Sequence, residues 1–139
     1  MMYRTNEEIW FVLETLYPGV SFGADCTLYS RVDERGNQIS DPIVDKWTRP
    51  EPKPSTAFLC AQFVRLRPKW DAKVAAFQAS QRVDKDIEFA RHQIDHAEDI
   101  GDEQAARQWR YYRAGVRTVP KQAGFPMNIT WPIRPKEVF

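Results

Sequence analysis

The stretch from Lys69 to Ile100 contains neither glycine nor proline, and this constrains the fold more than any other feature. Its apolar residues form two groups, from Trp70 to Phe77 and from Val83 to Ala97, and within each group they recur at steps of three and four, which is the spacing of one helical face. They are Trp70, Val74, Phe77, Val83, Ile87, Ala90, Ile94 and Ala97. At 1.5 Å per residue the helix would be roughly 45 Å long. A helix of this length needs a second element to cover its apolar face.

The next segment supplies that cover. Gly101 breaks the long helix, and Asp102 is suited to cap a second one. The second helix carries a matching stripe of Ala105, Trp109, Tyr112 and Val116. We therefore predict an antiparallel helical hairpin that turns near residues 98–102, in which residue numbers across the contact sum to about 200.

Charged side chains form two stripes on this hairpin. The basic stripe consists of Arg107, Arg110, Arg113 and Arg117, and the acidic stripe consists of Asp84, Glu88, Asp95 and Asp99. The predicted register brings Glu88 near Arg110 or Arg113. The stripes are either flanking salt bridges, each worth about 0–1 kcal/mol, or a basic groove for an acidic ligand. We favour salt bridges, because complementary acids lie on the adjacent helix.

The N-terminal part predicts a small α+β unit. Thr5 and Glu8 form a capping box, and the helix that follows has an apolar face and stops at Pro18-Gly19. A β-hairpin is expected from strands near 26–32 and 38–46, with turn formers between them and Pro42 restricting the second strand to an edge. One helix and two strands are marginal alone, so this unit needs further chain or a partner.

Alternate prolines in 49–54 favour an extended, semi-rigid linker. Ser55 then caps a short helix, and Pro68 is expected in the first turn of the next helix. The predicted fold class is α+β, with a small N-terminal helix and β-hairpin, a long antiparallel helical hairpin and an extended proline-rich tail. The predicted divisions are 1–48, the linker 49–54, the helical region 55–118 and the tail 119–139.

The tail combines prolines with aromatic residues. Its prolines are Pro120, Pro126, Pro132 and Pro135. They stiffen the backbone, so little entropy is lost when the tail docks on a surface. Phe125 and Trp131 must be buried either by folding back or by a partner, and the sequence does not decide between these two. Ile129 and Trp131 alternate around Thr130, as in a short strand that adds to a sheet edge.

Composition excludes several classes of function. Twenty Lys and Arg against nineteen Asp and Glu give a net charge of +1, which argues against nucleic-acid binding. The longest apolar run, from Ile9 to Leu13, is far shorter than the roughly 20 residues of a membrane span. Glu7 and Glu8 differ from the basic start of a signal peptide, so a cytosolic protein is expected. Cys26 and Cys60 are then reduced, small apolar residues.

Catalytic motifs are missing from the sequence. His92 and His96 share one helix face beside acidic residues, but no third histidine and no CxxC completes a zinc site. No phosphate loop, GxGxxG or GxSxG motif is present either. We therefore expect no enzyme, no cofactor and no metal, and interpret the histidines as residues of a polar helix face.

One segment resembles a known family. Trp109-Arg110-Tyr111-Tyr112-Arg113, Gly124-Phe125-Pro126 and Ile129-Thr130-Trp131-Pro132 follow the order of the C-terminal signature of bacteriophage tail assembly chaperones and tail fibre assembly proteins. Gly115-Val116 departs from the family's usual Ala-Leu pair, at a cost of up to about 1 kcal/mol in helix stability. The Asp-Trp segment often found upstream in the family is not visible.

The resemblance implies a non-enzymatic assembly factor that acts in the host bacterial cytoplasm, with or without later retention in the virion tail. Its partner would be a tail fibre or a tail or baseplate protein, with no nucleic acid and no membrane. The predicted partner-binding residues are Trp109, Arg110, Tyr112, Arg113, Arg117, Phe125, Pro126, Ile129, Trp131 and Pro132. The alternative is a permanent structural subunit, in which Val83, Ile87 and Ile94 form a coiled-coil seam between copies. A metal-dependent enzyme around the histidines is a third hypothesis.

Overall fold

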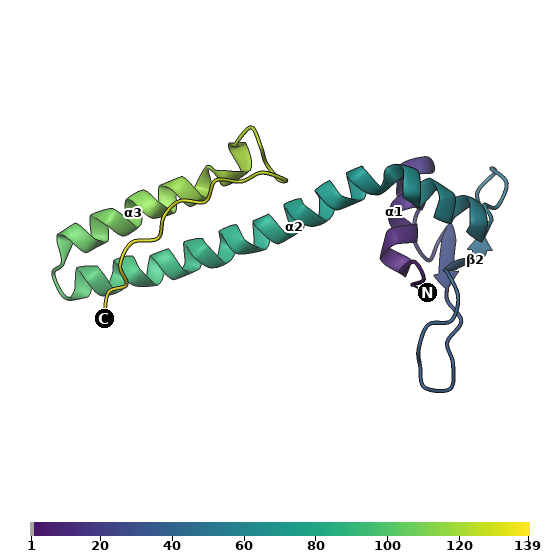
Figure 1. Cartoon of the computed structure of the whole chain (residues 1–139), viewed down its shortest axis with the longest axis horizontal. Helices are drawn as coiled ribbons and strands as arrows, with labels where there is room; N and C mark the ends of the chain where they lie inside the picture. Colours follow the sequence, from purple (N-terminus) through teal and green to yellow (C-terminus); the bar gives the residue numbers. More distant parts are fainter. Residues whose placement is uncertain (1) are drawn as a thin grey trace. The chain divides into compact units, whose positions relative to one another are not determined.

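The computed structural model describes residues 2–139, so Met1 of the predicted 1–48 unit lies outside the described residues. The chain forms α1 (Asn6–Leu16), β1 (Cys26–Tyr29), β2 (Ile43–Trp47), α2 (Thr56–Asp99), α3 (Glu103–Arg117) and a 3-10 helix, η1 (Val119–Lys121) (Figure 1). The predicted α+β class is confirmed. Contacts divide the chain into two compact units, Met1–Trp70 and Asp71–Phe139, and α2 contributes residues to both.

In the first unit, α1 begins as its sequence predicts. The Glu8 amide donates to Thr5 Oγ1 at 3.1 Å, and the Thr5 amide donates to Glu8 Oε1 at 2.8 Å. This capping box satisfies two amides that the helix leaves unpaired at its start. Ile9, Val12 and Leu13 then lie on the buried face of α1.

The β-hairpin is shorter than predicted. β1 ends at Tyr29, and β2 begins only at Ile43, where Leu28 pairs with Val44. Pro42 immediately precedes β2 and has no amide hydrogen to donate, which accounts for the late start of the second strand. The chain between the strands forms a long loop that contains a single further bridge, between Val32 and Gln38.

The core of this unit combines α1, the hairpin and the first turns of α2. Its buried residues are Ile9, Val12, Leu13, Val20, Cys26, Val44, Leu59, Phe63 and Leu66. Leu59, Phe63 and Leu66 follow helical spacing on α2, so a helix covers the apolar layer that the small sheet cannot bury alone.

The prediction that a new helix begins near Pro68 is wrong. Ser55 does cap the helix, since the Phe58 amide donates to Ser55 Oγ at 3.2 Å, but α2 continues through Pro68 to Asp99. Proline removes the hydrogen bond to the carbonyl four residues earlier, which belongs to Val64. Both Pro68 and Val64 are exposed. The lost bond therefore falls on the solvent side of the helix, where it is tolerated.

The second unit contains the predicted helical hairpin. α2 and α3 run antiparallel beside each other (Figure 1), and Gly101 adopts a φ of 76° in the turn between them. Such left-handed geometry favours glycine. Tyr112 Oη donates to Asp86 Oδ2 at 3.2 Å, in agreement with the predicted register.

The predicted partner of Arg110 is wrong. Arg110 pairs with Glu98 at 2.9 Å, whereas Glu88 pairs with Arg91 and His92 on its own helix. Partners three and four residues away lie within easy reach on one helix. Glu88 is therefore neutralised locally and does not bridge to α3.

The tail is only partly extended. It begins with η1, and residues 129–139 form neither helix nor strand, so the short strand expected at Ile129 and Trp131 is not formed. Phe125 and Trp131 pack against the buried cluster of the hairpin, so the tail folds back on its own chain.

None of the helices in residues 2–139 combines the length and the hydrophobicity that a membrane span requires.

Candidate partner-binding groove

α3 has one buried and one basic face. Ala106, Trp109, Tyr112 and Val116 are buried at steps of three and four. Trp109 is fully buried, with its ring centroid 5.6 Å from Phe89 on α2 and 5.5 Å from Tyr112. The edge-on contact between Phe89 and Trp109 packs α2 against α3, and the contact with Tyr112 lies within α3.

Two arginines hold the tail against the hairpin. The guanidinium of Arg82 lies 3.9 Å from the ring centroid of Trp131, and that of Arg134 lies 4.3 Å from the centroid of Phe89. A cation over an aromatic face is worth about 0.5–2 kcal/mol, depending on its desolvation. In the first contact the arginine lies on α2 and the aromatic ring on the tail. In the second contact the arginine lies on the tail and the ring on α2.

Asp86 connects these contacts to α3. Its carboxylate accepts from Tyr112 Oη at 3.2 Å and from Arg134 at 3.3 Å, and Arg82 lies at 3.5 Å. The side chain of Asp86 is only 10% exposed. A carboxylate buried to this extent needs such partners to offset the loss of water. Asp86 therefore ties α2, α3 and the tail together at one point.

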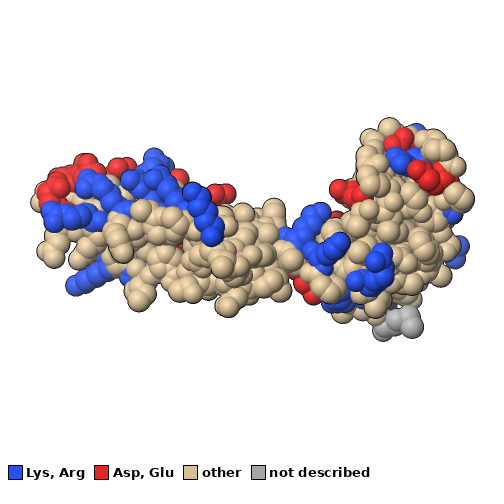
Figure 2. Space-filling view, turned by 90° about the horizontal axis from the view of Figure 1, so that it is seen from above, with Lys and Arg blue, Asp and Glu red and all other residues tan. Residues whose placement is uncertain are grey.

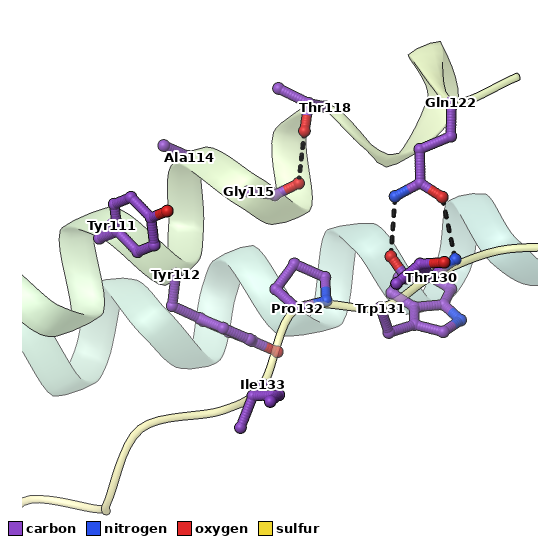
Figure 3. A pocket seen from close by; sticks show the side chains of 10 residues that line it. All are labelled: Tyr111, Tyr112, Ala114, Gly115, Thr118, Gln122, Thr130, Trp131, Pro132 and Ile133. Atoms are coloured by element: carbon purple, nitrogen blue, oxygen red, sulfur yellow. Dashed lines mark hydrogen bonds between the residues drawn. The ribbon is translucent and has the colours of Figure 1, made fainter.

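Further bonds fix the path of the tail. Gln122 both donates to the Thr130 carbonyl (2.7 Å) and accepts from the Thr130 amide (2.9 Å) (Figure 3). Trp109 Nε1 donates to the Lys136 carbonyl at 3.2 Å, and the Val138 amide donates to Gln93 Oε1 at 2.6 Å. The tail is thus anchored at its start, middle and end.

Two glycines allow the tail to fold closely. A Cβ at Gly124 would overlap the Asn128 carbonyl oxygen, so the turn there requires glycine. A Cβ at Gly115 would lie 3.1 Å from Pro132 Cγ. Gly115 is one of the two positions that depart from the family's usual Ala-Leu pair. Glycine has a lower helix propensity than alanine, and at position 115 it allows Pro132 of the tail to approach α3 closely.

A groove follows α3 along its junction with the tail. Three adjoining hollows, of about 600, 760 and 480 Å³, share lining residues and together extend from Thr118 back to Asp102. The first is lined by Tyr111, Tyr112 and Gly115 on α3, by Thr118 directly after it, and by Thr130 to Ile133 on the tail (Figure 3). Tyr111 and Ile133 line both the first and the second hollow and are 84% and 93% exposed. We call these hollows together "the groove".

The charges that line the groove differ between its hollows: the middle hollow is lined by Arg107 and Lys136, and the hollow nearest the turn is lined by Asp102, Lys136 and Glu137. Residues 103–139 contain seven Lys and Arg and only two Glu. Within residues 2–139, salt bridges from this set involve only Arg110 and Arg134. Arg107 and Lys136 line the groove without such a pair. In Figure 2 the Lys and Arg side chains gather over the hairpin, and acidic side chains gather near its tip.

Most residues that line the groove lie in the part of the chain that matches a known family. The sequence model of the family described as "Phage tail assembly chaperone protein" matches residues 66–136, which is just over half of the chain. The chain belongs to this family. No curated protein and no solved structure matches the chain.

In this member of the family, the predicted partner-binding residues lie in the hairpin core, in the groove wall, on the hairpin surface and in the packed tail. Trp109 and Tyr112 are buried in the hairpin core, which agrees with the spacing that indicated a helix face. Trp131 and Pro132 are half-buried and line the groove. The others lie on the hairpin surface or in the packed tail: Arg110, Arg113, Arg117, Phe125, Pro126 and Ile129.

The remaining candidate groups are the histidines and the cysteines. His92 is 64% exposed beside Glu88, and no group of three or more His, Cys, Asp or Glu is placed to hold a metal ion in residues 2–139. Burial raises the pKa of both the Cys26 and the Cys60 thiol. A raised pKa disfavours the thiolate, which is the nucleophilic form.

Sequence reasoning missed the residues that dock the tail. Arg82, Phe89, Gln93 and Arg134 carried no motif, and Asp86 was not among the acidic residues singled out. Asp86 and Arg134 are separated by 48 positions. The one signal available was Asp86 itself, an acidic residue three positions after Val83 and one before Ile87 on the apolar face.

Proposed function

We propose that this tail assembly chaperone binds a tail fibre or another tail protein through its C-terminal region and keeps that protein competent for assembly in the host bacterial cytoplasm. The observation that carries the proposal is the family match at 66–136, since it covers the hairpin, most of the tail and most of the groove. No catalytic step is required.

The proposed mechanism is coverage of surface that the partner exposes before assembly. Unpaired strand edges and apolar patches lead to aggregation when they are left open. Trp131 and Pro132 contribute apolar contacts from the groove wall. Arg110 and Arg117 are exposed on α3 and set the register of the partner by charge.

Phe125, Pro126, Ile129 and Arg113 have an indirect role in this proposal. Phe125 and Ile129 pack against the hairpin cluster, and Arg113 is half-buried with its Nε buried and unpaired within residues 2–139. They hold the tail in the conformation that forms the groove. Trp109 and Tyr112 support it from beneath.

Co-expression with each tail protein of the same phage tests the proposal. The full chain should raise the soluble, correctly oligomerised fraction of one of them. A variant lacking residues 119–139 should lose this effect, because the tail wall of the groove is gone. The proposal would be refuted if every tail protein were equally soluble and equally well assembled without this chain.

A second candidate is a permanent subunit of the tail, baseplate or fibre attachment. The observation that favours it is Phe77 on α2, whose ring is 64% exposed and available to a neighbouring subunit. Quantitative proteomics of purified virions separates the candidates. A fixed copy number per particle identifies a subunit, and absence identifies an assembly factor.

A further inference from the structure

The groove has the dimensions of a binding site for a polypeptide segment. Its three hollows adjoin along the whole of α3, which has 15 residues. A helix of that length is about 22 Å long, and about six or seven residues of extended chain span the same distance. Small-molecule sites bury most of their ligand in one enclosed cavity. A long, open channel suits an extended chain better.

The tail wall offers unpaired backbone groups. In the described chain, no backbone–backbone hydrogen bond involves residues 129–139. Side chains pair only the amides of Thr130 and Val138 and the carbonyls of Thr130 and Lys136. The Ile133 and Arg134 amides have no partner among these bonds. An extended segment with free amides and carbonyls can pair with a second extended chain.

The charged side chains of the middle hollow indicate the charge of the peptide that would bind there. Arg107 on α3 and Lys136 on the tail line the middle hollow, and neither forms a salt bridge with a described residue. Exposed Tyr111 and Ile133 beside them supply apolar and aromatic surface. Complementary charge guides association and fixes the register of a bound chain. The occupant should therefore combine acidic with apolar side chains.

The neighbouring helix argues against a nucleic acid. Residues 83–102 contain seven Asp and Glu and two Lys and Arg. They lie on α2 and the turn, next to the basic helix α3. A phosphate backbone carries a charge at every nucleotide and would meet these acids. A short peptide can place one or two carboxylates against Arg107 and Lys136 and avoid them.

We infer that the groove binds an extended peptide segment in which acidic and apolar residues alternate, presented by the tail protein that this chaperone assists. The inference rests on the proposed function and assigns the chemistry of its partner. Apolar side chains of the peptide occupy the hollows beside Tyr111 and Pro132. Its carboxylates pair with Arg107 and Lys136, and its backbone pairs with free groups of the tail.

An array of overlapping peptides of about twelve residues, drawn from the tail proteins of the same phage, tests this inference. The full-length chaperone should bind acidic, apolar peptides and should not bind an oligothymidine of similar charge. Arg107→Glu and Tyr111→Ala should each weaken the strongest peptide by about tenfold or more in fluorescence anisotropy. Lys85→Glu and Phe77→Ala are matched exposed controls outside the groove and should stay within about twofold.

Each contrary result has a defined meaning. Selection of basic peptides, preference for the oligothymidine, or equal binding by groove and control variants overturns the inference. The co-expression assay separates it from the proposed function. If Arg107→Glu/Tyr111→Ala still keeps the tail protein soluble, the groove assignment is wrong and the proposed function stands. If the wild-type chain has no effect on any tail protein, the proposed function itself fails.

Discussion

The two compact units of this protein are built on different principles. The first surrounds the fully buried Leu13 with apolar residues from a helix, a hairpin and the start of α2. The second has two helices and a tail, and its centre combines Trp109 with the charged Asp86. The first is a conventional apolar core, whereas the second depends on directional contacts. The family match lies mostly on the second unit, so the directional contacts belong to the part that identifies the protein.

Large-to-small substitutions in the two centres should give the largest effects. Trp109→Ala and Phe63→Ala each remove a fully buried ring and should lower the free energy of unfolding by about 3–5 kcal/mol. Hydrogen exchange should show the loss in the second unit for Trp109→Ala and in the first unit for Phe63→Ala. Chemical denaturation gives the magnitude.

The control for these variants is Tyr111→Ala, which truncates an 84% exposed ring and should change stability by less than about 0.5 kcal/mol. The effects of Trp109→Ala and Phe63→Ala should add in the double variant, because the residues belong to separate clusters. Strong non-additivity would show that the two cores are coupled.

Loss of the directional contacts is tested by Asp86→Ala. It leaves the buried Tyr112 hydroxyl and Arg134 without their acceptor and should cost about 1–3 kcal/mol. The tail should also detach more often, so trypsin should cleave after Lys136 faster than in the wild type. Asp84→Ala removes an exposed carboxylate two positions earlier and should leave the cleavage rate unchanged. Equal protection of the tail in both variants would contradict the role of Asp86.

A smaller effect is expected in the first unit from Thr5→Ala. It removes the side-chain acceptor of the capping box and should destabilise α1 by about 1 kcal/mol. Thr15→Ala in the same helix removes only a bond to the Phe11 carbonyl and should have little effect. Thermal unfolding followed by circular dichroism compares the two. Identical midpoints would show that the capping box contributes nothing.

The smallest effect concerns the loop between β1 and β2. The hydrogen bond from the Asn37 backbone amide is the main cause of the lowered pKa of Asp33. The Arg35 amide and the Asn37 side chain donate further hydrogen bonds to the same carboxylate. Because folding lowers the pKa of Asp33, its ionised carboxylate stabilises the turn at a pH above the pKa that Asp33 has in the unfolded chain. This stabilisation is lost as the pH falls through the pKa of Asp33 in the folded protein. The amide shifts of Asn37 and Arg35 should therefore move in acid. Asp33→Asn should abolish this movement, and its persistence would assign it to another group.

The sequence predicted local structure better than long-range contacts. The capping box, the turn at Gly101 and the buried stripe with Trp109 and Tyr112 depend on residues within a few positions of one another, so spacing revealed them. Pro68 was misjudged because propensity alone does not show which side of a helix faces solvent. The contacts of Arg82 with Trp131 and of Arg134 with Asp86 required the path of the tail in space, which no local pattern specifies.

The passage of α2 through both units has a practical consequence for dissecting this protein. A cut between the units must open a helix, and any new helix start exposes amides that need an acceptor. Asp71 is the first residue of the second unit, and aspartate is among the best side chains for that purpose. A fragment that begins at Asp71 therefore starts with its own N-terminal cap, and it contains every residue that lines the groove.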